Sequence, residues 1–203
     1  MSWDEHAAGW DENEAVRAYA GAAFGCLQRL HQTGRLDLDG ARILDFGCGT
    51  GLLTERLAPR AERVVALDTS VAMVEVLASK AERRGWSNVD AIGASIGWAQ
   101  RERPRLFRPP FDVVVSSSVC AFLDDYTGTV ATLASLLRPG GSFIQWDWEL
   151  NSEDEEPFGL TRVQMVDALA GAGLGDVRVE TAFEIDVDGQ RMSPLMGCGH
   201  TAR

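Results

Sequence analysis

Three glycines at positions 47, 49 and 51 stand between a short apolar run and a helical pattern, in the sequence Ile43-Leu44-Asp45-Phe46-Gly47-Cys48-Gly49-Thr50-Gly51. Glycine has no Cβ, so such a loop can turn sharply and let a ligand lie against the main chain. In a dinucleotide-binding fingerprint the third glycine stands five positions after the first. In this chain the fifth position after Gly47 is Leu52, and the third glycine stands one residue earlier, at Gly51. The loop is therefore a candidate ligand site that matches a pyrophosphate cradle poorly.

Two carboxylates flank this loop. Asp45 precedes it, where it would repel a phosphate and suits a cationic group such as an amine. Asp68 closes the next apolar run, and an acid at that place can accept hydrogen bonds from both ribose hydroxyls of a nucleoside. Together they predict a site for an adenosine that carries a positive group and no phosphates. The alternative is a tight strand–helix turn in which Asp68 only caps the helix.

Strand and helix patterns alternate along the rest of the chain. Apolar runs predict strands over 41–46, 63–67, 88–92, 111–115, 142–148, 177–187 and 194–198. Helical spacing predicts helices over 7–32, 52–57, 71–84, 126–137 and 158–172, and a short helix with a loop within 97–110. Thr69 or Ser70 is expected to cap helix 71–84, and Gly85 to end it. This order predicts an α/β fold with a mainly parallel sheet, and the hairpin signal Asp188-Gly189 adds one antiparallel strand.

Composition narrows the class of protein. The length of 203 residues favours one globular domain. The formal net charge of −11 repels a phosphate backbone, so a nucleic acid is not expected as a partner. The four cysteines lie far apart and only three histidines are present, so no metal site is expected. No apolar run approaches the roughly 20 residues of a membrane span, and the start MSWDEHAAGWDENE does not read as a signal peptide. A cytoplasmic protein with reduced thiols is expected.

At this point four motifs indicate a family. ILDFGCGTG, VVALDTSVAM, FDVVVSSS and LLRPGGSFI resemble the motifs of class I S-adenosylmethionine (SAM)-dependent methyltransferases. WDENEAVRAYAGAAF resembles the cap of their small-molecule branch, which is similar to the ubiquinone and menaquinone C-methyltransferases. The likeness covers nearly the whole chain. It implies a Rossmann-like, seven-stranded, mostly parallel sheet with the last strand antiparallel, helices on both faces and an N-terminal helical cap. It also implies one domain over 1–203, with the cap at 1–38 and the core at 39–203.

The resemblance implies a cofactor site for SAM, with S-adenosylhomocysteine as product. The glycine loop would hold the methionine part, Asp45 its amino group and Asp68 the ribose. The expected cofactor-binding residues are Trp10, Tyr19, Asp45, Phe46, Gly47, Cys48, Gly49, Gly51, Asp68, Thr69, Ser70, Met73, Ala94, Ser95, Ile96, Ser116 and Ser117. The family usually has an acid after the third strand, but this chain has Ala94 there. Ser95 or backbone groups are expected to replace that adenine contact.

No residue stands out as a general base. Methyl transfer from a sulfonium depends mainly on holding donor and acceptor in line and on excluding water. The candidates for a catalytic role are His6, Trp148 and Glu149. Many relatives carry a histidine after the fourth strand, where this chain has Val119-Cys120-Ala121-Phe122, and Cys120 is expected to be a packed thiol.

The sequence therefore predicts methyl transfer to O, N or C of a small molecule. Two alternatives stay open, a methyltransferase that acts on a protein and a SAM-binding regulator without catalysis. Nucleic-acid methyltransferases are disfavoured, because Ser116-Ser117-Ser118-Val119 lacks the Asn/Asp-Pro-Pro-aromatic loop and Val119 replaces the proline of cytosine C5 enzymes. The glycine spacing disfavours an NAD-linked oxidoreductase. No membrane partner is expected, and the oligomeric state is not readable from the sequence.

Overall fold

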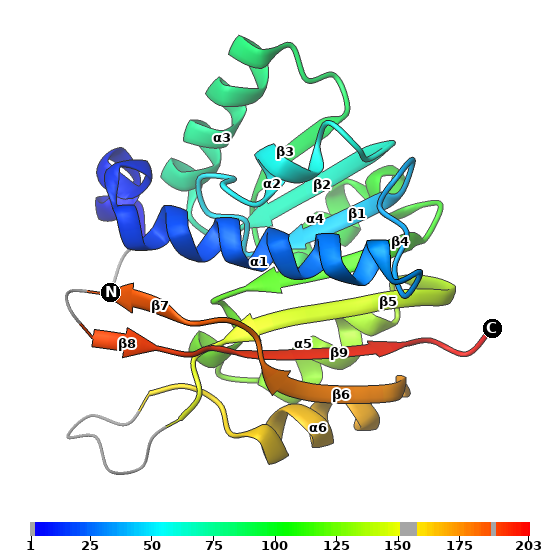
Figure 1. Cartoon of the computed structure of the whole chain (residues 1–203). Helices are drawn as coiled ribbons and strands as arrows, with labels where there is room; N and C mark the ends of the chain where they lie inside the picture. Colours follow the sequence, from blue (N-terminus) through cyan, green and yellow to red (C-terminus); the bar gives the residue numbers. More distant parts are fainter. Residues whose placement is uncertain (1–2, 151–157, 188–189) are drawn as a thin grey trace. The chain divides into compact units, whose positions relative to one another are not determined.

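The structure is a computed structural model that describes residues 3–150, 158–187 and 190–203 (Figure 1). The chain divides into two compact units, Met1–Phe111 and Asp112–Arg203. That residues 1–203 act as one domain, with a cap at 1–38 and a core at 39–203, stays a prediction. Across the described residues, no helix combines the length and the apolar content that a bilayer span requires.

The first unit contains parallel strands and the helices that follow them. Its strands are β1 (Arg42–Phe46), β2 (Arg63–Asp68) and β3 (Val89–Gly93). Its helices are the 3-10 helix η1 (Trp3–Glu12), α1 (Glu14–Gln32), α2 (Thr54–Leu57), α3 (Val71–Arg84), α4 (Ile96–Glu102) and the 3-10 helix η2 (Pro104–Phe107). β2 pairs in parallel with both β1 and β3, with Asp45 opposite Ala66 and Asp68 opposite Gly93. The carboxyl ends of these strands therefore share one edge, as the sequence predicted.

The strands of the first unit are continuous apolar runs in the sequence because their residues are buried. Ile43 and Leu44 of β1 and Val64–Leu67 of β2 are almost fully buried. Strands of a parallel sheet are covered on both faces, so they lack the alternation of half-exposed strands. The same pattern brings Asp45 into the buried part of β1, where it is 1% exposed.

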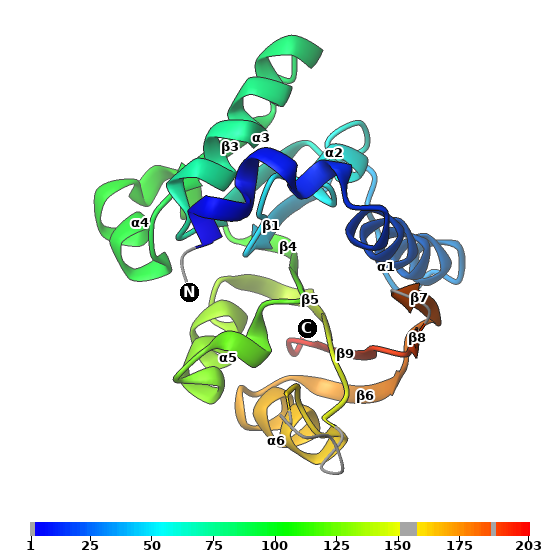
Figure 2. The ribbon, with the colours of Figure 1, turned by 90° about the vertical axis from the view of Figure 1, so that its left-hand side faces the viewer.

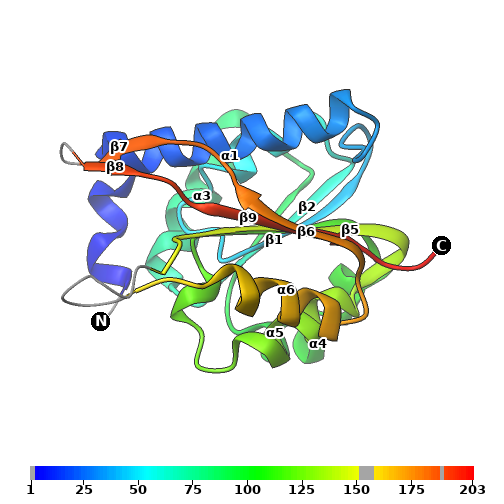
Figure 3. The same ribbon diagram turned by 60° about the horizontal axis from the view of Figure 1, so that its bottom comes forward.

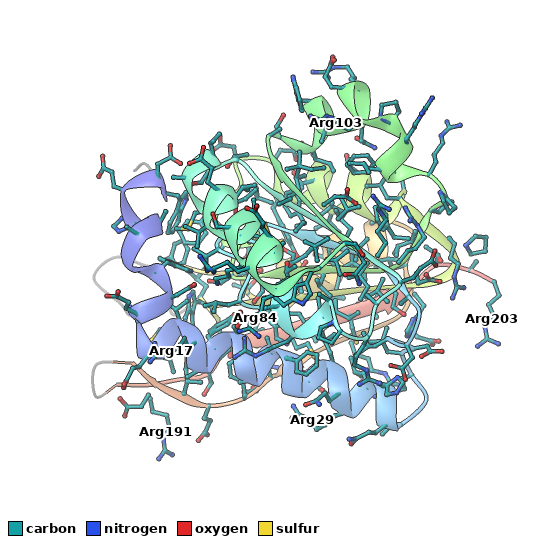
Figure 4. The ribbon with its side chains drawn as sticks, turned by 90° about the horizontal axis from the view of Figure 1, so that it is seen from above. Arg17, Arg29, Arg84, Arg103, Arg191 and Arg203 are labelled. Atoms are coloured by element: carbon teal, nitrogen blue, oxygen red, sulfur yellow. The ribbon has the colours of Figure 1, made fainter. Side chains whose placement is uncertain are left out.

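The N-terminal segment differs from the single helix predicted over 7–32. The chain forms η1 and then starts again as α1, with Asn13 between them. The Asn13 side chain accepts hydrogen bonds from the amides of Ala15 (2.9 Å) and Val16 (3.3 Å), so it caps α1. Arg17, near the start of α1 (Figure 4), donates to the Asp11 carbonyl at 2.8 Å. An N-cap in the middle of an apolar periodic run thus divides it into two elements.

Helix α3 begins and ends where the sequence predicted. The Ser70 hydroxyl accepts a hydrogen bond from the Met73 amide at 3.2 Å, which makes Ser70 the N-cap. Gly85 ends the helix in the left-handed conformation, with φ of 68°. The helix start is therefore fixed directly after β2 and Asp68.

The second unit begins within β4 (Phe111–Ser117). The remaining elements are the 3-10 helix η3 (Cys120–Phe122), α5 (Tyr126–Ala134), β5 (Leu137–Asp147), α6 (Arg162–Gly171), β6 (Gly175–Thr181), β7 (Ile185–Val187), β8 (Gln190–Met192) and β9 (Leu195–His200). β9 runs antiparallel to both β5 and β6. Helices α5 and α6 lie side by side against one face of the strands of this unit (Figures 2 and 3).

The predicted fold class is confirmed. The sheet has seven strands in the order β3-β2-β1-β4-β5-β9-β6, it is mostly parallel with β9 antiparallel, and helices surround it. β7 and β8 form a separate two-stranded sheet. The predicted hairpin turn Asp188-Gly189 lies outside the described residues.

Two boundaries in the second unit differ from the prediction. α5 ends at Ala134, three residues before the predicted end of the helix, and β5 already begins at Leu137, five residues before the predicted start of the strand. The predicted strand 177–187 is divided into β6 and β7. Its pairing with the last strand ends near Pro194, whose carbonyl accepts from the Ala182 amide at 2.9 Å. Proline has no amide hydrogen to continue a ladder, so the pairing is interrupted there.

Candidate functional site

The three glycines of the loop after β1 all adopt the left-handed conformation, with φ of 71° at Gly47, 52° at Gly49 and 85° at Gly51. A Cβ on Gly51 would lie 2.3 Å from Cδ1 of Leu77, so this glycine lets the loop pack against α3. A Cβ on Gly49 would meet only Nε1 of Trp10, at 3.8 Å. Gly51 is thus required for packing, whereas the backbone at Gly49 leaves room for a ligand to approach.

Asp68 connects the glycine loop to the start of α3. Its Oδ2 accepts a hydrogen bond from the Gly49 amide at 2.8 Å, and its Oδ1 accepts one from the Ser70 amide at 2.9 Å. Ser70, and not Asp68, is the N-cap of α3. A carboxylate offers about four acceptor positions, so each oxygen can accept a further hydroxyl. This geometry fits an acid that binds a diol at the end of β2.

Asp45 is a buried carboxylate beside the same loop. Its Oδ2 accepts a hydrogen bond from the Thr54 hydroxyl at 2.5 Å. Burial raises the pKa of Asp45 to about 6, and the negative charge of Asp68 acts in the same direction, although the Thr54 hydrogen bond opposes them. A cationic ligand group would stabilise the charged form of Asp45 and reverse this shift.

The 3-10 helix η1 is attached to the glycine loop and to α3 by two acids. Asp11 accepts a hydrogen bond from the Thr50 hydroxyl at 2.6 Å and forms an ion pair with Lys80 at 2.5 Å. Asp4 accepts from the Ser70 hydroxyl at 2.5 Å and from the Ala72 amide at 3.2 Å. The sequence analysis missed both acids, because their partners lie far along the chain and no local motif marks them. They hold η1 and Trp10 at the loop.

We expect Asp11→Ala to release η1 from the loop. The Lys80 side chain is only 11% exposed, and an unpaired, largely buried charge costs about 1–3 kcal/mol. Amide hydrogen exchange should therefore become faster over residues 3–12 and stay unchanged in β1 and β2. Glu12→Ala removes a neighbouring exposed acid and serves as the matched control. Equal protection of η1 in Asp11→Ala and in the wild type would contradict this assignment.

The other cofactor candidates of the first unit lie in the elements around the loop. Tyr19 of α1 and Met73 of α3 are buried, and so are Phe46 and Cys48. Burial raises the pKa of the Cys48 thiol well above its usual value, so this cysteine is protonated and packed. Thr69 is exposed beside Asp68.

The segment after β3 contains Ala94, Ser95 and Ile96, which are expected near the adenine in place of the family's acid. The Ala94 amide donates to the Asp68 carbonyl at 2.8 Å, which ties this segment to β2. The Ser95 hydroxyl caps α4 by accepting from the Trp98 amide at 3.4 Å, and Ile96 begins that helix. The Ser95 side chain is therefore engaged in a cap, and the backbone of this segment stands next to Asp68.

The remaining candidates lie in the second unit. Ser116 is fully buried at the end of β4, with its hydroxyl 3.4 Å from Sγ of Cys120, and Ser117 follows it. Glu149 is exposed, and its carboxylate accepts from Nε (2.9 Å) and Nη2 (3.2 Å) of Arg162. Trp148 is half-buried, whereas Trp146 is fully buried. The catalytic candidate His6 belongs to the first unit, where its exposed ring lies 6.2 Å from that of Trp3.

Asp147, which no sequence motif marks, is a fully buried carboxylate at the end of β5. Its Oδ1 accepts a hydrogen bond from the Ala121 amide at 3.1 Å. Burial raises the pKa of Asp147 to about 7, against the effect of the hydrogen bonds that it accepts. Burial also raises the pKa of the adjacent Cys120 thiol well above its usual value, so Cys120 is a packed thiol.

One group of side chains has the composition of a metal site. Ligand atoms of His31, Asp37 and Asp39 all lie within 4.8 Å of one another. However, Nε of Arg60 donates to Asp39 at 2.7 Å, and its Nη2 lies 2.8 Å from Nε2 of His31. A metal ion would have to displace this guanidinium, so the group is an arginine-centred cluster. The expected absence of a metal stays a prediction.

The glycine loop lies within the part of the chain that resembles known sequences. Residues 44–143 match the family model described as a methyltransferase domain. The ubiquinone biosynthesis O-methyltransferase of Xanthomonas euvesicatoria is 36% identical over 110 residues, which are 54% of this chain and 44% of that protein. The enzyme of the same name from Methylocella silvestris is 38% identical over 107 residues, 51% of this chain and 38% of that protein. The matches thus span less than half the length of these relatives.

Solved structures share the fold across most of the chain. The N-methyltransferase NodS from Bradyrhizobium japonicum, in complex with S-adenosylhomocysteine, has a TM-score of 0.71 at 19% identity and covers 95% of this chain and 90% of its own. The 1,6-didemethyltoxoflavin-N1-methyltransferase of Burkholderia thailandensis has a TM-score of 0.69 at 17% identity, with 99% and 87% covered.

These findings confirm the resemblance that the motifs indicated. The chain has the fold of class I methyltransferases. More particularly, residues 44–143 match the model of a methyltransferase domain, and about half of the chain is similar to part of the ubiquinone biosynthesis O-methyltransferases.

Proposed function

We propose that this protein transfers a methyl group from SAM to a small-molecule acceptor and releases S-adenosylhomocysteine. The observation that carries this proposal is the arrangement around the glycine loop. Gly49 leaves open space at its Cβ position, and the carboxylates of Asp45 and Asp68 stand at the ends of neighbouring strands. Two acids beside an open backbone suit a nucleoside that carries a cation, and they oppose a phosphate.

The charges and hydrogen-bonding groups of the first unit support SAM as its ligand. Asp68 has free acceptor capacity for the ribose hydroxyls, and the buried Asp45 would bind the amino group. Met73 and the Ala94–Ile96 segment would flank the adenine. When bound, SAM supplies an electrophilic methyl group on a sulfonium. The chain's own part is to orient this group and to exclude water, and η1 with Trp10 would help to close the site.

Similarity to named enzymes supports a small-molecule acceptor. The curated relatives are ubiquinone biosynthesis O-methyltransferases, and one structural neighbour was solved with 1,6-didemethyltoxoflavin. The net charge of −11 argues against nucleic acid. We further propose that residues 1–203 act as one domain with a cap at 1–38. None of the four cysteines forms a disulfide within the described residues, which supports a reducing, cytoplasmic location.

Binding and turnover of SAM test this function directly. We expect a thermal shift with SAM and none with NADH, because a ligand stabilises the state that binds it. A screen of amines, phenols, acids and quinone precursors, scored by homocysteine release in a coupled assay, should then identify an acceptor. A shift with NADH alone would overturn the proposal. SAM binding with turnover only on a protein, or with no turnover at all, would instead favour the two alternatives.

The affinity for SAM should depend on pH through Asp45. Its pKa is raised to about 6, so the carboxylate loses its charge as the pH falls through 6 and no longer attracts the amino group. We expect the affinity to be about tenfold weaker at pH 5 than at pH 7, since a carboxyl group with a pKa of about 6 is roughly one-tenth ionised at pH 5 and almost fully ionised at pH 7. Calorimetry at both pH values measures this ratio. Asp45→Asn should bind weakly at both, and an equally strong pH dependence in that variant would assign the effect elsewhere.

A further inference from the structure

A short basic segment, residues 101–108, stands out in a chain whose formal net charge is −11. This arginine segment contains one acid, Glu102, and four arginines, which are Arg101, Arg103, Arg105 and Arg108. All four arginines are exposed, and among the described residues none of their side chains forms an ion pair or a hydrogen bond. Figure 4 shows Arg103 apart from the other labelled arginines of the first unit. The fold therefore leaves four neighbouring positive charges without compensation.

Buried residues hold the arginine segment in place. Phe107 is 7% exposed, and its ring centroid lies 6.0 Å from that of Phe111, which is 1% exposed. Arg42, the first residue of β1, donates from Nη2 to the Leu106 carbonyl at 3.2 Å, and its guanidinium carbon lies 5.6 Å from the centre of the Phe111 ring. The segment is thus attached at the amino end of β1, whereas Asp45 and the glycine loop lie at the carboxyl end of that strand.

An exposed aromatic ring precedes the arginine segment on α4. Trp98 is 41% exposed, and Arg101 lies three positions later in the same helix, so the two side chains share one face. The helix is fixed by the fully buried Ala99 on its other side and by the Ser95 cap at its start. Tryptophan and arginine are the side chains that dominate the binding energy of protein–protein interfaces. The composition of this surface is therefore that of an interface.

We propose that Trp98 and the four arginines form a docking surface for an acidic segment of a partner protein. Guanidinium groups form paired hydrogen bonds with carboxylates, and such charge-assisted bonds are stronger than neutral ones. A short peptide segment has to cover only these residues, whereas a long nucleic acid would extend over a chain whose net charge of −11 repels it. The inference does not depend on the proposed function, because the arginine segment and the glycine loop are attached at opposite ends of β1.

The fixed backbone of this surface favours binding. The buried ring of Phe107 and the hydrogen bond from Arg42 to Leu106 hold the arginine segment before a partner arrives. Less conformational freedom is then lost on association, so more of the interaction energy appears as affinity. Because the charges are exposed, salt should screen them, and the affinity should fall as the ionic strength rises.

A fluorescein-labelled acidic peptide of glutamate and aspartate with a central leucine tests the docking surface by fluorescence anisotropy. We expect saturable binding at low salt, and none by the same peptide with glutamine and asparagine in place of its acids. Arg103→Gln combined with Arg105→Gln should weaken binding about tenfold, since an exposed ion pair contributes about threefold. Trp98→Ala should weaken it several-fold and leave the salt dependence in place. Arg35→Gln combined with Arg83→Gln removes two other exposed arginines of the first unit and is the matched control.

The outcomes decide which partner the surface fits. A wild-type protein that does not bind the acidic peptide, or equal affinities of the Arg103/Arg105 variant and the Arg35/Arg83 control, would overturn the proposal. Tighter binding of a single-stranded RNA of the same charge would assign the surface to a nucleic acid instead. Self-association in sedimentation that disappears in the Arg103/Arg105 variant would assign it to a second copy of the chain.

Calorimetry with SAM separates this inference from the proposed function. The affinity for SAM should change by less than about twofold in the arginine variants, because substitutions at distant sites act independently. Absence of SAM binding from the wild type would refute the proposed function and leave the peptide result to be judged by itself. A large loss of SAM affinity in the Arg103/Arg105 variant alone would overturn the separation of the docking surface from the cofactor site.

Discussion

Asp68→Ala is expected to weaken SAM binding at least a hundredfold. The carboxylate would lose its hydrogen bonds to both ribose hydroxyls, and bonds to a charged group contribute about 1.5–3 kcal/mol each. Two of them amount to roughly 3 kcal/mol or more, which is about two orders of magnitude in affinity. The variant also loses the contacts to the amides of Gly49 and Ser70, so the loop itself is held less firmly. Isothermal titration calorimetry measures the change.

A matched control separates this effect from a general loss of charge. Asp90 is another carboxylate of the first unit, and it forms an ion pair with Arg63 at 2.5 Å near the start of β2. Asp90→Asn should bind SAM with nearly wild-type affinity. Asp68→Asn keeps one acceptor oxygen and should fall between the wild type and Asp68→Ala. If Asp68→Ala and Asp90→Asn bound equally well, Asp68 would not be the ribose ligand.

The elements around the glycine loop could be predicted because local signals and tertiary packing agree there. Val64–Leu67 form an apolar run because β2 is covered on both faces, and Ser70 and Gly85 mark the two ends of α3 by their own side-chain and backbone chemistry. The carboxyl-end positions of Asp45 and Asp68 then follow from the parallel order of β1 and β2. Local signals therefore sufficed to predict that the glycine loop, Asp45 and Asp68 lie at one edge of the strands of the first unit.

The missed residues are those whose roles depend on distant partners. In the sequence nothing distinguishes Asp11 from the other acids. Its role in holding η1 comes from its contacts with Thr50 and Lys80. Asp147 stands between two tryptophans in a strand, and only its burial and its contact with Ala121 distinguish it from a surface acid. The break at Asn13 was hidden because the apolar spacing continues on both sides of it. Such features arise from long-range packing, which hydrophobic periodicity does not encode.

Gly51→Ala should destabilise the fold by about 2–5 kcal/mol, because two costs add. A non-glycine residue in the left-handed conformation costs about 1–2 kcal/mol, and φ at Gly51 is 85°. The added methyl would also lie 2.3 Å from Cδ1 of Leu77, and overpacking a buried contact costs about 1–3 kcal/mol. Urea unfolding followed by circular dichroism gives the free energy of unfolding.

Gly34→Ala isolates the first of these costs. Gly34 has φ of 70°, but its Cβ position has no atom within 4 Å, so only the backbone term of about 1–2 kcal/mol applies. A double-mutant cycle with Leu77→Ala tests the second cost, because removal of the Leu77 side chain makes room for the new methyl. In that background Gly51→Ala should cost about as much as Gly34→Ala. If instead its cost did not change, the contact with Leu77 would not be the reason that position 51 requires glycine, and the packing of the loop against α3 would need another explanation.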